Sequence, residues 1–552
     1  MTYLNFVSFF GIFGLCFIAW IFSEDRRVIP WRVIIWGIGL QLVLGYLVFQ
    51  QPQTREWLRL FSSLLDGIFA SADTGARFVF GRLLVPPTGQ EPYALLPLTP
   101  EGTCPAGQVL LDDLTSVANA ATRYCTTNRL AYVFAFRALP AVVFFSGFMA
   151  LLENLGIIQI IVNVFAKLFF WTMRLSGAEA LSGAANIFVG IEAAIVVKPY
   201  LPKMTRSELC AILACCFGTA ASSTLAIYVS FLRPVFPNIL GHLVSASIIA
   251  IPACFVLSKI LVPETEVPVT MGGIPKEDKS AKKDDDGELE NAGGEAMKRM
   301  SPMDATIIGA LDGLKMAASI AAILILIVGL VDLVNQIFGW LATVESINFF
   351  GLFVIPLPIG GFFKIVNLPN IQGALFYPLT LLTGVSLEDS WTASVIIGRR
   401  LLETAIPPYQ ALAQASKDGL ISDRTVIIVS YALSGFAHLA SVGIFVGGTI
   451  ALIPSRRRDI SDLGWKALFV GTLATLMISC IAGVFDDGSP SILGEKKKAE
   501  PVQVKPAVTN SPSGSPTASP SALPTASPSI SPSIASPSPS PSFSPKVSPT
   551  LR

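Results

Sequence analysis

An acidic residue, Glu192, lies in the apolar part of a stretch that runs from Ser182 to Glu208 and is rich in glycine and alanine. A carboxylate at the depth of a lipid bilayer costs about 2.5–3.5 kcal/mol on insertion scales, so residues of this kind are usually functional. In this stretch Glu192 would accept hydrogen bonds from a ligand or couple to a cation. The alternative is a structural hydrogen bond to a broken helix, or a side chain that extends to the membrane surface.

Two further polar positions in apolar surroundings have chemistry of their own. Glu403 follows Arg399 and Arg400 in a second short, interrupted segment. It is either a ligand contact or half of an ion pair, because arginines three or four positions earlier on a helix can reach it. His438, in the sequence SGFAHLAS at 434–441, is a hydrogen-bond donor to a substrate, a group that titrates near neutrality, or a core histidine whose hydrogen bonds are satisfied.

Composition places these residues in a membrane protein. Of 552 residues, 52% are hydrophobic and only 14% are charged, and many runs of 18 or more apolar residues occur. The formal net charge of +1 gives no field that would attract nucleic acid. No G-x-S-x-G, H-E-x-x-H or Walker pattern is present, which argues against an enzyme. We therefore expect a multi-pass protein in a lipid bilayer that is neither an enzyme nor a nucleic-acid binder.

The order of spans and loops predicts six parts. They are scaffold helices at 1–155 with an extracytoplasmic insertion at 86–128, a first repeat at 156–262, a charged cytoplasmic linker at 263–303, scaffold and interfacial helices at 304–390, a second repeat at 391–486, and a disordered Ser/Pro-rich tail at 487–552. Each repeat is expected to contain a short hairpin with an acidic residue, then a span with small and hydroxyl residues at its middle, then a second full span.

Basic loops give the orientation. Arginines at 26, 27 and 32, the basic residues at 198–206, the lysines of the linker and the arginines at 456–458 should all be cytoplasmic. They agree only if segments 157–200 and 391–420 do not each cross once, which also leaves the N-terminus and the tail outside the cytoplasm. The predicted fold is an all-α polytopic membrane protein with inverted repeats, in which these two segments are re-entrant hairpins or interfacial pieces.

Breaks in membrane helices free backbone polar groups, which are tolerated only where they line an enclosed or watery cavity. The sequences GTAASST at 218–224 and SGFAHLAS at 434–441 predict two such breaks. A run of small residues also allows helices to pack closely, and that is the alternative for each sequence alone. Two of them, each after a hairpin that carries an acidic residue, favour a binding site in mid-membrane.

Two longer segments resemble one family. NIFVGIEAAIVVKPYLPKMTRSE and SGFAHLASVGIFVGGTIALIPSRRRDI resemble the first hairpin and the C-terminal motif of the concentrative nucleoside transporters. The resemblance extends over about residues 1–485, apart from the insertion and the charged linker. It implies a fold with two re-entrant helical hairpins and about eight transmembrane helices, usually as a homotrimer, in the plasma membrane (the inner membrane of a bacterial cell). It also implies import of nucleosides driven by a gradient of Na+ or H+.

The resemblance assigns site residues, with departures. Asn186, Val189, Thr219 and the carbonyl of Ala220 match the sodium ligands of the family, and oxygen ligands suit this hard cation. The substrate-binding positions expected here are Glu192, Glu403, Phe436, His438 and Ser441. A family Gln-Thr pair is replaced by Ile191 alone, the family N-E-F aligns with 404–406 so that its acid is absent or displaced to Glu403, and a family Asn is His438. These changes leave open a symporter of another polar solute, or a receptor that has lost transport.

Two cysteines and the tail are separate questions. Cys104 and Cys125 flank an insertion that is expected to be extracytoplasmic, where a disulfide would close the loop. The Ser/Pro-rich tail is expected to act as a spacer.

Overall fold

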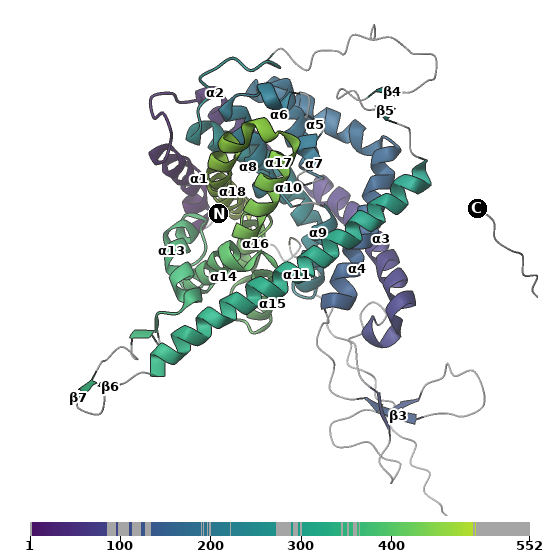
Figure 1. Cartoon of the computed structure of the whole chain (residues 1–552), viewed down its shortest axis with the longest axis vertical. Helices are drawn as coiled ribbons and strands as arrows, with labels where there is room; N and C mark the ends of the chain where they lie inside the picture. The colour runs from purple at the N-terminus through teal and green to yellow at the C-terminus, as the bar shows by residue number, and fades with distance from the viewer. Residues whose placement is uncertain are drawn as a thin grey trace, which may run out of the picture. The chain divides into compact units, whose positions relative to one another are not determined.

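The structure is a computed structural model of the whole chain. It describes residues 3–85, 95–97, 110–112, 123–126, 134–188, 190, 192–195, 197, 200–220, 222–271, 289–290, 296–297, 301–343, 346–349, 353–356, 362–363, 365–488 and 492, and within some helices only the backbone. The chain divides into two units, Met1–Lys497 and Lys498–Arg552. Every described helix and strand belongs to the first unit, and the second lies outside the described residues (Figure 1).

The first half of the chain contains helices of very different lengths. Its elements are α1 (Tyr3–Ile21), α2 (Trp31–Phe49), α3 (Pro52–Leu84), α4 (Phe134–Asn154), α5 (Ile157–Met173), α6 (Gly177–Ala185), α7 (Glu192–Ile195), η1 (Leu201–Lys203), α8 (Arg206–Gly218), α9 (Ser222–Leu232) and α10 (Ile239–Leu261). Short strands β1 (Leu95–Pro97), β2 (Leu110–Asp112) and β3 (Arg123–Thr126) form an antiparallel sheet in the predicted insertion, with β3 between the other two.

The second half begins with the longest helix, α11 (Pro302–Thr343), which packs along α4 and runs obliquely past α14 (Figure 1). After it come α13 (Leu368–Leu382), α14 (Ser390–Glu403), α15 (Ile406–Lys417), α16 (Asp423–Ala432), α17 (Leu439–Leu452), η2 (Pro454–Arg456) and α18 (Arg457–Phe485). Two antiparallel strand pairs, β4 (Leu289–Glu290) with β5 (Ala296–Met297) and β6 (Ser346–Phe349) with β7 (Phe353–Pro356), flank α11 in the sequence. The fold is mostly helical, as predicted. The short strands were not predicted from the sequence.

Five described helices are long and apolar enough to cross a membrane: Tyr3–Ile21, Trp31–Phe49, Ile239–Leu261, Pro302–Thr343 and Pro454–Phe485. Large apolar side chains cover the outside of several of them. On α1, Phe6 and Phe10 are 58% and 66% exposed, and on α11 Ile325 is 77% exposed. Water would be an unfavourable neighbour for so many exposed apolar side chains, whereas lipid tails are a suitable one. The helices thus have the surface of a multi-pass membrane protein.

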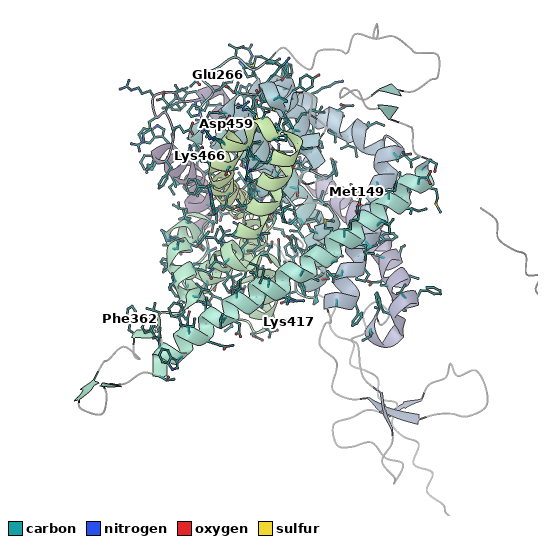
Figure 2. All side chains as sticks on the ribbon, in the orientation of Figure 1. Met149, Glu266, Phe362, Lys417, Asp459 and Lys466 are labelled. Carbon is teal, nitrogen blue, oxygen red and sulfur yellow. The ribbon has the colours of Figure 1, made fainter. Side chains whose placement is uncertain are left out.

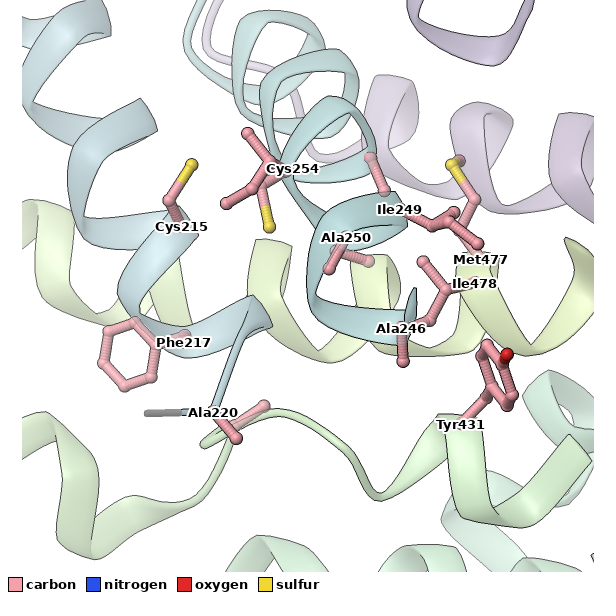
Figure 3. Close-up of a cluster of buried hydrophobic side chains, with 14 of the residues drawn as sticks. Cys215, Phe217, Ala220, Ala246, Ile249, Ala250, Cys254, Tyr431, Met477 and Ile478 are labelled. Carbon is pink, nitrogen blue, oxygen red and sulfur yellow. The ribbon is translucent and has the colours of Figure 1, made fainter. Parts of the chain in front are cut away.

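The core lies where α18 and α10 pack against α8, α16 and α1. Along α10 nearly every side chain is buried, and α18 is buried over most of its length. Figure 3 shows part of this core, with Cys215 of α8 and Cys254 of α10 near each other, and with Met477 and Ile478 of α18 facing α10. A helix that is apolar all round is expected at the centre of a bundle.

Charged residues from three separate loops meet at one end of the helices. Glu24, between α1 and α2, accepts hydrogen bonds from Lys466 of α18 and from Arg206 at the start of α8, the latter at 3.1 Å. Arg206 also reaches Asp459 of α18 at 3.3 Å. In Figure 2, Asp459, Lys466 and Glu266 lie near one another, whereas Lys417 lies at the other end. Three of the four regions that the basic-residue pattern assigned to a common side therefore lie together in the structure, while the lysines of the linker lie outside the described residues.

Both halves show the same succession of elements. In the first, α6 and α7 precede the pair α8–α9 and the long α10, and in the second α14 and α15 precede the pair α16–α17 and the long α18. An N-cap serine or threonine begins each helix pair: Thr205 accepts from the backbone of Glu208, and Ser422 from that of Thr425. Arg206 and Arg424, which follow these caps, both bind an acidic residue of α18 or its end, Asp459 and Asp486.

Candidate functional site

The two interrupted helix pairs touch at their breaks. Helix α8 ends at Gly218 and α9 begins at Ser222, while α16 ends at Ala432 and α17 begins at Leu439. Across the gap, the backbone N–H of Phe436 donates to the carbonyl of Thr219 at 3.3 Å. Figure 3 shows Ala220, just beyond the end of α8, beside the loop that leaves the α16 end marked by Tyr431. Both breaks that the small-residue sequences predicted are present, and they meet.

The crossing is close enough to require glycine at one position. A Cβ atom on Gly435 would lie 2.7 Å from the carbonyl oxygen of Phe217 and 2.8 Å from that of Gly218. Cβ atoms essentially never approach backbone atoms so closely. Gly435 therefore lets the second break pass directly over the first.

Helices α6 and α7 form a short folded-back segment. Ser176 begins α6 with a capping box, in which its hydroxyl accepts from the backbone of Glu179 and the Glu179 carboxylate accepts from the backbone of Ser176. The hydroxyl of Ser182 donates to the carbonyl of Ala193 at 3.1 Å, which ties α6 to α7. Glu192 is the first residue of α7, and its side chain lies outside the described residues, so its proposed contacts stay predictions.

The predicted sodium ligands are only partly described, and one of them, Asn186, has an unpaired oxygen. Asn186 is fully buried; its amide donates to the carbonyl of Ser182 at 3.1 Å, while its Oδ1 has no hydrogen-bond partner. Thr219 and Ala220, at the break after α8, are also buried. Val189 lies outside the described residues. A buried amide oxygen without a donor is costly unless something positive fills the place.

His438 is a cap as well as a candidate ligand. It begins α17, and its Nδ1 accepts from the backbone N–H of Ser441 at 3.3 Å. The Ser441 hydroxyl lies 3.1 Å from Nδ1 and 3.0 Å from Nε2 of the same ring. Phe436 packs edge-on against the His438 ring, with 6.1 Å between centroids. The structure thus brings Phe436, His438 and Ser441 together at the second break, and the role of His438 as a helix cap was not anticipated.

Glu403 forms the ion pair that its spacing allowed. Its carboxylate accepts from Nε of Arg399 at 2.9 and 3.0 Å and from Nη2 at 2.8 Å. Glu403 is 3% exposed and ends α14, where Thr404 reverses the chain with a φ of +70°. Because one guanidinium binds both oxygens of this carboxylate, Glu403 has less capacity left to bind a ligand.

Arg400 is a buried charge. From the sequence alone, Arg399 and Arg400 were equally able to pair with Glu403. In the structure Glu403 forms its ion pair with Arg399, and Arg400 is 1% exposed. Its Nη1 donates to the carbonyl of Ala432, at the end of α16, and to the hydroxyl of Thr475 of α18 at 3.0 Å. The sequence signal for it is an arginine inside an apolar segment, but an ion pair with Glu403 accounts equally well for either arginine.

A second buried charge lies at the end of α10. Lys259 binds Glu179 of α6 at 2.6 Å and Glu264, beyond α10, at 3.0 Å. The Thr205 hydroxyl, which caps α8, donates to Glu264 at 2.9 Å. Lys259 therefore connects the starts of α6 and α8 through their caps, and it explains how the folded-back segment is anchored.

Helices interrupted in pairs, crossing at their breaks and accompanied by two folded-back segments, are typical of secondary membrane transporters. Comparison with known proteins agrees. The family model for the N-terminus of Na+ dependent nucleoside transporters matches residues 10–83 of this chain, and the model for their C-terminus matches residues 242–483. A third family model, a nucleoside-recognition gate, matches residues 135–235. The chain belongs to the concentrative nucleoside transporter family.

Relatives and solved structures cover most of the chain. An uncharacterized transporter of Bacillus subtilis, YutK, is 33% identical over 86% of this chain and 98% of its own length. Mouse solute carrier family 28 member 3 is 31% identical over 88% of this chain, which spans 59% of that protein. The structure of CNTnw in an inward-facing, substrate-bound state is 31% identical, with a TM-score of 0.67 over 87% of this chain and 98% of CNTnw.

Proposed function

We propose that the protein is a symporter that imports nucleosides across the plasma membrane, driven by a gradient of sodium. Membership of a family whose models describe Na+ dependent nucleoside transporters supports the solute class and the ion. The observation that carries the proposal for this chain is the buried, partnerless Oδ1 of Asn186, in the turn after α6. Asn186, Val189, Thr219 and Ala220 would supply neutral oxygens to Na+, as a hard cation requires.

Alternating access requires a part of the protein that has two stable arrangements. We propose that the two folded-back segments are this part. In this proposal α6–α7 and α14–α15 are re-entrant hairpins that enter from opposite sides. Helix α4 and the two interrupted pairs, added to the five long apolar helices, then complete eight crossings. Glu192, Phe436, His438 and Ser441 contact the solute, with Glu403 beside them. The charged end that contains Glu24 and Arg206 faces the cytoplasm, the termini lie outside, and three copies form a homotrimer.

The proposal is tested by uptake into proteoliposomes that contain the purified full chain. Labelled uridine and adenosine are offered under an inward Na+ gradient, under an inward H+ gradient, and with neither. Uptake that requires Na+ is expected. Uptake driven by H+ alone would reject sodium as the coupling ion. Binding of nucleosides with no vectorial flux under either gradient would instead favour a receptor.

A further inference from the structure

Arg400 presents a free two-donor edge inside the protein. Its Nη1 is used by Ala432 and Thr475, but Nε and Nη2 have no hydrogen-bond partner, although the residue is 1% exposed. Nε–H and Nη2–H point the same way along one side of the guanidinium plane. That side is the fork that matches the two oxygens of a carboxylate or a phosphate.

No acidic residue in the described part of the chain neutralises Arg400. The nearest acid in the sequence, Glu403, is held by Arg399 on the neighbouring face of α14. The carbonyl of Ala432 and the C-terminal end of α16 favour a cation, but they engage Nη1 alone. A desolvated guanidinium with two unmet donors is energetically unfavourable unless an anion completes its hydrogen bonds.

The groups around Arg400 are those of a binding site. Tyr228 of α9 and Tyr409 of α15 stack with 4.5 Å between ring centroids, and both rings, like that of His438 at the second break, lie near Arg400. At Thr404, just after the end of α14, a buried hydroxyl also lacks a partner. Unmet polar groups therefore occur at two places in the α14–α15 segment, and those of Arg400 lie beside aromatic rings.

We propose that Arg400 binds an oxyanion of the transported solute through Nε and Nη2, so that the solute class is acidic: a nucleoside-like molecule that carries a carboxylate or a phosphate. The inference rests on the proposed function of solute transport, and it specifies the substrate. It also gives a physical explanation for the departures from the family pattern at the predicted substrate-binding positions. A solute anion would balance the charge of Arg400, whereas a neutral solute would leave Arg400 and the co-transported cation uncompensated.

Binding to the purified full chain in sodium-containing buffer tests this. The probes are uridine, its carboxylate derivative orotidine, and uridine 5′-monophosphate, measured by calorimetry. Wild-type protein should bind at least one acidic probe more tightly than uridine. Arg400→Met should weaken that probe about 10- to 100-fold, because a charge-assisted hydrogen-bond pair is lost, and leave uridine unchanged or tighter. Arg400→Lys, which keeps the charge without the two-donor edge, should bind the acidic probe with an affinity between those of the wild type and Arg400→Met. Arg456→Met at the charged end is the matched control.

Several results would overturn the inference. One is wild-type protein that binds and transports uridine while ignoring both acidic probes; this rejects the acidic solute and leaves nucleoside symport intact. Another is acidic-probe affinity that does not depend on Arg400. If no solute is transported at all, the proposed function fails, and the calorimetry still shows whether acidic probes need Arg400. Should acetate, inorganic phosphate or chloride alone bind at Arg400 without competing with the acidic solutes, the anion site exists but is not the solute site.

Discussion

The backbone N–H of Phe436 and the carbonyl of Thr219, 3.3 Å apart, join the breaks of two helix pairs from opposite halves of the chain. Each break exposes backbone groups that lipid could not satisfy. Here one break supplies a donor and the other an acceptor, so part of the cost is met between them. The remaining unpaired oxygens and donors are those available to an ion and a solute.

This contact depends on the absence of a side chain at Gly435. In Gly435→Ala the new Cβ would lie 2.6–2.8 Å from Thr475, Phe217 and Gly218, which forces the breaks apart. We expect a loss of about 1–3 kcal/mol, as for other overpacked cores. Thermal unfolding and uptake should both decline. Gly443→Ala on α17, where a Cβ meets nothing within 4 Å, is the control. A Gly435→Ala protein with unchanged Tm and uptake would contradict the close crossing.

Lys259 should be needed to anchor the first folded-back segment. Lys259→Met would leave Glu179 buried without its cation, and Glu264 without one of its partners. Removing one member of a buried pair costs about 3–5 kcal/mol, so a large drop in Tm is expected in detergent. Lys315→Met, which removes an exposed pair with Asp312, should change Tm little.

The double variant Lys259→Met with Glu179→Gln tests the cause. If the uncompensated carboxylate is responsible, adding Glu179→Gln should recover part of the lost stability. Equal Tm values for the single and double variants would show that packing, and not charge, sets the effect.

Sequence alone located the breaks better than it located the charges. Small and hydroxyl residues at 218–224 and 434–441 indicated both interruptions because the two sequences recur, each after a segment that carries an acidic residue. Arg399 and Arg400 were indistinguishable in spacing, since both i+3 and i+4 positions reach Glu403. Which of them pairs with Glu403 depends on the direction in which α14 faces α16 and α18, and local sequence does not contain that information. The same holds for Lys259, whose partner Glu179 lies far away along the chain.

The charged end should make stability depend on pH. Partial burial disfavours ionisation of Glu24, but hydrogen bonds from Lys466 and Arg206 outweigh it and lower the pKa of this carboxylate. The unfolded chain therefore binds the proton more readily. The stabilisation is present above the usual Glu pKa of about 4.3 and is lost as pH falls through the lower folded value. Glu24→Gln should flatten Tm against pH below about 5.

The matched control for this profile is Asp312→Asn, which alters an exposed pair on α11. In Asp312→Asn, Tm should change with pH as steeply as in the wild type. An unaltered slope in Glu24→Gln would mean that other carboxylates determine the acid sensitivity, and that the contact of α1, α8 and α18 at this end contributes little.

Asn186 should carry the response of the protein to sodium. A ligand that binds only the folded state raises Tm in proportion to its concentration over its dissociation constant, so replacing K+ by Na+ should stabilise the wild type. Asn186→Ala removes the buried, partnerless Oδ1 and should abolish the Na+-dependent rise in Tm as well as Na+-dependent uptake. Asn186→Asp keeps an oxygen at the same place and should retain part of the rise. Asn370→Ala on α13 should behave like the wild type. Full Na+ stabilisation of Asn186→Ala would move the cation site away from the turn after α6, and a protein that Na+ does not stabilise in any form would place sodium coupling in doubt.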